Sequence, residues 1–144
     1  MSAVARRVAG RVAERVAERA LAAAAALVLP VAARLLPLRT TLAICDRWPS
    51  HPARGPRYPA AALAGRVRRW MRRGRGPWAD TCLTRALVLY AMLRQHGHHP
   101  RLHVGVAGSA RCFTAHAWVS VDGRPVGEPP DALDGYRELL VHAA

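Results

Sequence analysis

The segment that most constrains this fold is DTCLTRALVLYAMLRQHG, residues 80 to 97, which is apolar on nearly every side. Asp80 and Thr81 are good N-cap residues and Gly97 is a natural C-terminal cap, so we expect a helix from Cys82 to about His96. After its first turn only Arg94 and Gln95 are strongly polar. Because a helix this apolar must be covered on most sides, the segment predicts a central helix with other elements around it.

The pattern after Pro100 changes to the period of two residues that is typical of strands. Apolar residues alternate in RLHVGVA and again in CFTAHAWVSV, and Asp122 with Gly123 is a hairpin signal. We expect RPVGE as the returning strand and a short helix in the last stretch, residues 129 to 144. The sequence therefore predicts an α+β fold in which helices come first and a small antiparallel sheet packs on the central helix.

We expect residues 1–59 to form a helical region and linker, and residues 60–144 to form the core. RVAGRVAERVAER, residues 7–19, predicts an amphipathic helix that packs a Val/Ala face on the domain. The apolar run at 21–33 contains Pro30, is closed by Arg34 and is too short to span a membrane, so we do not expect insertion, although contact with an anionic surface stays an alternative. We expect a loop or linker at 39–59 and a helix at 60–73.

The chain of 144 residues carries a formal charge of +13, and all 22 of its basic residues are arginines. Such a charge attracts anionic partners at long range but identifies none of them. A nucleic-acid-binding module would be expected to interleave aromatic with basic residues, and that pattern is missing, so we expect no nucleic acid. The three cysteines form no CxxC pair, which favours a reducing cytoplasm.

Cys82 is a candidate nucleophile because it lies at the first turn of the central helix. The helix dipole and the free N–H groups of the first turn favour a thiolate there, although nearby Asp80 would oppose it and a buried, inert thiol is the alternative. His116 is the candidate base. It shares the polar face of its strand with Trp118, opposite the aliphatic face.

A third group should orient the imidazole of His116, and three acidic residues are candidates. Glu128 faces the side of His116 only if the hairpin loop has three residues, because a two-residue loop places it opposite Ala117 on the apolar face. Asp131 is the fallback. Asp122 is roughly 20 Å further along the strand and is expected to form only the turn.

Metal binding is the main chemical alternative. Four histidines fall close together in QHGHHPRLH, and Cys112 and His116 have a C-x-x-x-H spacing. The four histidines, His96, His98, His99 and His103, straddle a helix end and a turn. Residues in a cap and a strand seldom converge, so we expect no metal site.

Three stretches together resemble the transglutaminase-like core of the lasso-peptide B protein, a cysteine peptidase that removes leader peptides. They are ADTCLTRALVLYAMLRQHG, PRLHVGV and AHAWVSVDGRPVGE, with LLPLRTTL and the arginine-rich helix ending in PW adding to the likeness over most of the chain. The small size resembles the stand-alone form, which lacks a fused leader-binding domain. The resemblance implies a transglutaminase-like, papain-like fold.

The resemblance implies Cys82 as nucleophile and His116 as base. The third residue of the family is usually an aspartate, and Glu128 stands at that position here. It also implies as partners a precursor peptide, a PqqD-like leader-binding protein and the lasso cyclase. No cofactor is expected, since the chain has no GxxxxGK[ST] loop for ATP. A non-catalytic scaffold and an arginine-rich protein that binds nucleic acid or an anionic surface remain alternatives.

Overall fold

A computed structural model describes residues 3–50, 55–109, 111–129 and 131–144. Its helices precede a four-stranded antiparallel sheet, as the sequence predicted. The helices are α1 (Ala3–Leu35), α2 (Leu38–Asp46), α3 (Ala60–Met71) and α4 (Cys82–Gln95), and a short 3-10 turn covers Gly76–Trp78. The strands are β1 (Pro100–Ser109), β2 (Cys112–Val121), β3 (Arg124–Pro125) and β4 (Arg137–His142). The fold is therefore α+β.

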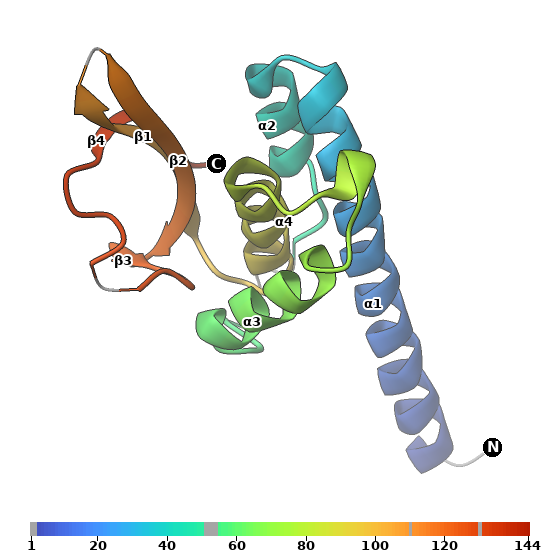
Figure 1. Ribbon diagram of the computed structural model, residues 1–144. Helices are drawn as coiled ribbons and strands as arrows, with labels where there is room; N and C mark the ends of the chain where they lie inside the picture. The colour runs from blue at the N-terminus through green and yellow to red at the C-terminus, as the bar shows by residue number, and fades with distance from the viewer. Residues whose placement is uncertain (1–2, 51–54, 110, 130) are drawn as a thin grey trace.

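Helix α4 is the central element, and its predicted bounds are confirmed to within a residue. It lies between the sheet and α1, with α2 and α3 beside it (Figure 1). Thr81 is the N-cap and forms a reciprocal capping box with Thr84, which satisfies the first free N–H groups of the helix. The side chains from Ala86 to Leu93 are all buried, and they form the middle of the core.

The two faces of the sheet differ in chemistry, as expected from the alternation in β2. Ala117 and Val119 face the core together with Leu102 and Val104 of β1. Trp118 lies on the opposite face. The core side is thus aliphatic, and the outer side carries the aromatic and polar groups.

Helix α1 is one continuous helix, and the separation of an amphipathic helix from a short apolar run is wrong. Pro30 lies inside the helix without ending it, and Leu29 and Ala25 are buried against the body. By length and composition α1 is able to cross a membrane, with 33% of its most apolar window buried inside the protein. The expectation that this segment is too short to span a membrane is therefore wrong. Length alone does not show where α1 lies.

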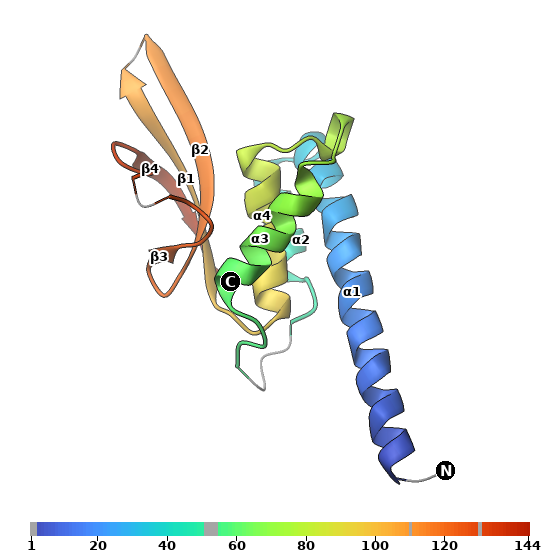
Figure 2. The same cartoon turned by 60° about the horizontal axis from the view of Figure 1, so that its bottom comes forward.

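The amino-terminal part of α1 extends beyond the rest of the molecule (Figure 2). The residues from 4 to 17 are exposed on every side of the helix. The Val/Ala face of this part, which was expected to pack on the domain, is therefore exposed to solvent.

Two further expectations are wrong. Part of the expected linker at 39–59 is helix α2, which begins after Pro37 and buries Thr41, Leu42 and Cys45; residues 51–54 lie outside the described residues. The expected C-terminal helix is instead a set of turns followed by β4, because pairing with the free edge of β1 satisfies the backbone of residues 137–142. The division at residue 59/60 stays a prediction.

The returning strand β3 is much shorter than the expected RPVGE. Its register, with Val121 opposite Arg124, leaves a two-residue turn at Asp122 and Gly123. Val126 adds one more hydrogen bond to Val119, and then the pairing stops. The edge of β2 is consequently open where the chain turns toward α3.

Candidate active site

Cys82 lies at the first residue of α4, where the sequence placed it, and is half-buried. Its backbone N–H makes no hydrogen bond within the described part of the chain, because the cap formed by Thr81 serves the N–H of Thr84. Asp80, the nearest carboxylate in sequence, is 3.4 Å from Arg85 and forms an ion pair with it. The negative charge beside the thiol is therefore offset by a neighbouring guanidinium.

A small cleft of about 20 Å³ adjoins Cys82. It is lined by Arg68 of α3, by Trp118 of β2 and by Glu128, among others. The volume holds roughly one water molecule. The cleft is thus too small for a peptide side chain, and a peptide would enter only if the side chains that line it moved.

Glu128 is the acidic residue that reaches His116. Its Oε1 lies 3.4 Å from Nε2 of His116, and both side chains are mostly shielded from solvent. The prediction that a two-residue loop places Glu128 opposite Ala117 on the apolar face is therefore wrong. The loop has two residues, and Glu128 still reaches His116.

The backbone at Gly127 explains this outcome. Gly127 has a φ of 78°, a left-handed conformation that ends the strand pairing and redirects the chain. Arg68 donates a 2.5 Å hydrogen bond to the Gly127 carbonyl, and a Cβ at residue 127 would lie only 2.9 Å from the Cβ of Ala64. Helix α3 therefore holds the segment that carries Glu128.

The imidazole of His116 stacks on the indole of Trp118, with ring centroids 6.0 Å apart, and Tyr136 lies beside it. No hydrogen bond joins the Cys82 thiol to His116 among those of the described residues. The structure thus brings Glu128 to His116 and to the cleft of Cys82. His116 is not among the described residues that line that cleft.

The two other candidate acids lie elsewhere. Asp122 has a φ of 50° and forms the hairpin turn, as expected. Asp131 begins the exposed turns before β4, where its carbonyl accepts from the N–H of Asp134. Neither carboxylate forms an ion pair with His116 in the described ranges.

Two histidines of QHGHHPRLH contact Tyr58, one at its ring and one at its carbonyl. The ring of His96 packs edge-on against Tyr58, and Nε2 of His98 is 2.8 Å from the Tyr58 carbonyl. Cys112 is exposed and lies four residues along β2 from His116, a separation of about 13 Å. Within residues 3–50, 55–109, 111–129 and 131–144, no three His, Cys, Asp or Glu side chains gather as a metal site.

A second histidine cluster escaped the sequence analysis. On the same outer face, Nε2 of His103 is 2.7 Å from the Ser120 hydroxyl, and Nδ1 is 2.7 Å from Oε1 of Glu138. Nδ1 is buried, and its contact with Glu138 lacks the geometry of a hydrogen bond. Glu138 was hidden because its segment was expected to be helical. Ser120 is buried, so this Ser–His–Glu arrangement presents no accessible nucleophile.

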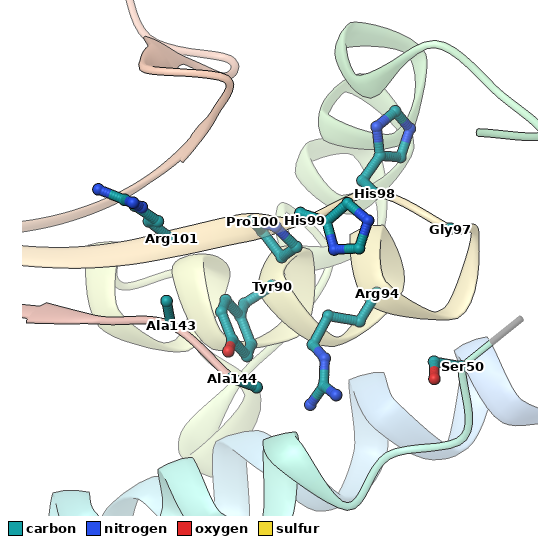
Figure 3. Close-up of a pocket in the computed structure, with 10 residues that line it drawn as sticks. All are labelled: Ser50, Tyr90, Arg94, Gly97, His98, His99, Pro100, Arg101, Ala143 and Ala144. Carbon is teal, nitrogen blue, oxygen red and sulfur yellow. The ribbon is translucent and has the colours of Figure 1, made fainter. Parts of the chain in front are cut away.

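The larger cavities lie away from Cys82. One of about 430 Å³ is at the carboxyl end of α4, where Tyr90, Arg94 and His99 surround it (Figure 3). Beside it, Asp46 accepts a hydrogen bond from Tyr90 and contacts His142. Burial and the Asp46 charge raise the pKa of Tyr90 to about 12. This network ties the end of β4 to α2 and α4.

Cys45 shows what a structural thiol looks like in this protein. It is fully buried, and burial together with the neighbouring Asp46 carboxylate raises its pKa to about 12. Cys112 is exposed on the β1–β2 hairpin. Of the three cysteines, Cys82 alone lies at a helix start and lines a cleft that contains an acid.

Comparison with known proteins agrees with this architecture. A family model described as the transglutaminase-like superfamily matches residues 23–141, from the middle of α1 to β4. No curated protein and no solved structure gives a significant match. The cysteine-headed helix packed on an antiparallel sheet is consistent with a fold of the cysteine-protease type. Because the match covers well over half of its length, the chain belongs to the transglutaminase-like superfamily.

Proposed function

We propose that this protein is a cysteine peptidase that removes the leader peptide from a lasso-peptide precursor. The observation that supports it most is the shared cleft of Cys82 and Glu128, with Glu128 in contact with His116. The three residues come from α4, from the segment after β3 and from β2, so only folding could bring them together. The lasso assignment rests on the sequence resemblance, and the peptidase assignment on the superfamily and on this cleft.

In the proposed reaction the Cys82 thiolate attacks the carbonyl carbon of the leader–core amide. His116 gives a proton to the leaving amine, the C–N bond breaks, and the acyl group stays on Cys82 as a thioester. His116 then takes a proton from water, whose oxygen attacks the thioester and releases the carboxylate and the thiol. The unpaired N–H of Cys82 would donate to the developing oxyanion, and Glu128 would orient the imidazole.

The small size of the cleft gives this proposal a structural requirement. The thiol and His116 must come within hydrogen-bond reach when the peptide is bound, since catalytic contacts are often longer in the free enzyme. The peptide would enter past the rim formed by Arg68 and Arg85. Trp118 lines the cleft, whereas Trp78 is not among its described lining residues and donates its indole N–H to the Leu27 carbonyl of α1.

The proposed partners follow from the same resemblance. A separate PqqD-like protein would bind the leader and present the precursor, and the ATP-dependent cyclase would close the ring after cleavage. The reaction would take place in the cytoplasm and would need no cofactor on this chain. These assignments are tested only by reconstitution.

The deciding experiment is mass spectrometry of a lasso precursor incubated with this protein and its leader-binding partner. We expect wild type to release the leader and Cys82→Ala to release none. The matched control is Cys112→Ala, which removes an exposed thiol outside the cleft and should cleave like wild type. Equal cleavage by Cys82→Ala would exclude Cys82 as nucleophile. A folded, partner-bound wild type that does not cleave would favour a non-catalytic scaffold.

A further inference from the structure

A cavity of about 590 Å³ lies between α1 and α3, both of which pack on α4. Arg15 and Arg19 of α1 line one side, and Arg66 and Arg69 of α3 line the other. We call this cavity the arginine groove. Trp70 and Tyr58 add two aromatic rings to its wall. Its volume is in the range of sites that bind ligands rather than single ions.

The charges of the arginine groove are not balanced from within. None of its four arginines forms an ion pair with a carboxylate in the part of the chain that the structure describes. Glu18 is the one carboxylate in the wall, and it pairs with Arg57, which also lies 3.7 Å from Glu14. Arginine stays charged at any physiological pH, so four guanidinium groups repel one another across the groove. An anion that entered would relieve this repulsion.

The cavity at the carboxyl end of α4 is a weaker candidate for an anion. Its Arg94 already donates to the Cys45 carbonyl and lies 3.6 Å from Asp46. His98 there is engaged with the Tyr58 carbonyl. The arginine groove therefore has more positive charge to offer than any other cavity described above.

The surroundings of the groove favour spaced carboxylates over a continuous phosphate chain. Glu14 and Glu18 stand at its edge and in its wall, where they would repel a polyanion that carries a charge at every step. Exposed Val12 and Val16 lie beside Arg15 and Arg19 on α1 and offer apolar contact, which a peptide side chain uses and a phosphate does not. Guanidinium groups bind carboxylates with two parallel hydrogen bonds, which suits aspartate and glutamate.

We propose that the arginine groove binds an acidic polypeptide segment. The segment would lie between α1 and α3, with its carboxylates on the four arginines and an apolar side chain against Trp70. The groove is separated from Cys82 by α3, whose opposite side carries Ala64 and Arg68 toward the cleft. Binding there is accordingly independent of the proposed peptidase activity.

The test is fluorescence anisotropy with a labelled peptide of alternating glutamate and alanine, using the Cys82→Ala protein so that the probe stays intact. A second peptide has glutamine in place of glutamate. The groove variant is Arg19→Gln with Arg69→Gln, and the matched control is Arg111→Gln with Arg124→Gln, which removes the same charge from exposed positions on the sheet hairpins. Thermal melting confirms that each variant is folded.

We expect the acidic peptide to bind and the glutamine peptide not to bind. The groove variant should weaken binding about tenfold or more, because two charge-assisted hydrogen bonds are lost, while the control changes it less than about twofold. Equal weakening by both variants would mean that only net charge matters and would overturn the proposal. Absence of binding by the unsubstituted groove, or tighter groove-dependent binding of single-stranded DNA, would overturn it too.

Discussion

Two histidines on the outer face of the sheet each contact Trp118 and a glutamate, but the two glutamates differ in their exposure to solvent. His103 and His116 both stack on Trp118, with ring planes 3° and 17° from that of the indole, and each lies beside a glutamate. The Glu138 side chain is 48% exposed, whereas that of Glu128 is 16% exposed and lines the cleft of Cys82. A histidine and an acid in contact are thus common to both, and the two pairs differ in the exposure of the acid and in the thiol beside it.

The strongest way to break this comparison is to remove each ring. His116→Ala should lower the rate of leader release by about a thousandfold, since a general acid–base group is lost. His103→Ala should leave that rate within a few-fold and lower the free energy of unfolding instead. Precursor cleavage and chemical denaturation of both variants measure this. A larger loss of cleavage in His103→Ala would reverse the assignment.

The acids give the next largest difference. Glu128→Gln keeps the shape of the side chain but removes the charge that would stabilise a charged His116, and we expect cleavage to fall about a hundredfold. Glu138→Gln should change cleavage less than about threefold, since solvent already screens that carboxylate. If the two variants cleave alike, Glu128 is not the third member of the site, and Asp131 becomes the next candidate.

The backbone before Glu128 can be tested with two glycines of equal conformation. Gly127 and Gly135 have φ angles of 78° and 79°, but only Gly127 has no room for a Cβ. Both Gly→Ala variants should lose about 1 to 2 kcal/mol of stability from the left-handed conformation. Gly127→Ala should also lose cleavage by about tenfold, because the clash with Ala64 displaces Glu128. Steady-state cleavage at saturating precursor separates the two, and equal activities would show that Glu128 does not need this segment.

The smallest effect is expected at Ser120. Ser120→Ala removes the hydroxyl that lies 2.7 Å from His103 and should cost about 1 kcal/mol of unfolding free energy without changing cleavage. Urea denaturation monitored by tryptophan fluorescence, to which the buried Trp118 contributes, would detect this difference. A loss of cleavage would show that the two histidines are coupled through the indole ring.

Elements with strong local signals were predictable from the sequence. Helix α4 has caps at both ends and an apolar circumference, and β1 and β2 alternate around a clear turn. Helix α2 was missed because its nine residues become helical by burying one face against α4, which no local pattern reveals. Strand β4 was missed because RELLVH also fits a helix, and only the free edge of β1 decides between the two.

The candidate site residues also differ in how far local sequence patterns predict them. Cys82 and His116 were found from their places on a helix and a strand, which depend on local periodicity. The contact of Glu128 could not be derived from register, because the pairing ends after Val126 and Gly127 redirects the chain. Arg68, which holds the Gly127 carbonyl, comes from 59 residues earlier in the chain. Such a contact between distant segments leaves no signal in either one.

The two parts of helix α1 differ in local stability. Its residues near Ala25 and Leu29 are buried against the body, while those from 4 to 17 are exposed and depend mainly on helix propensity. The backbone amides of the second part should exchange with solvent fast and those of the first part slowly. An occupant that reached along the arginine groove onto Val12 and Val16 would slow exchange in the exposed turns. Amide exchange in the exposed part of α1 would thus report binding in the arginine groove.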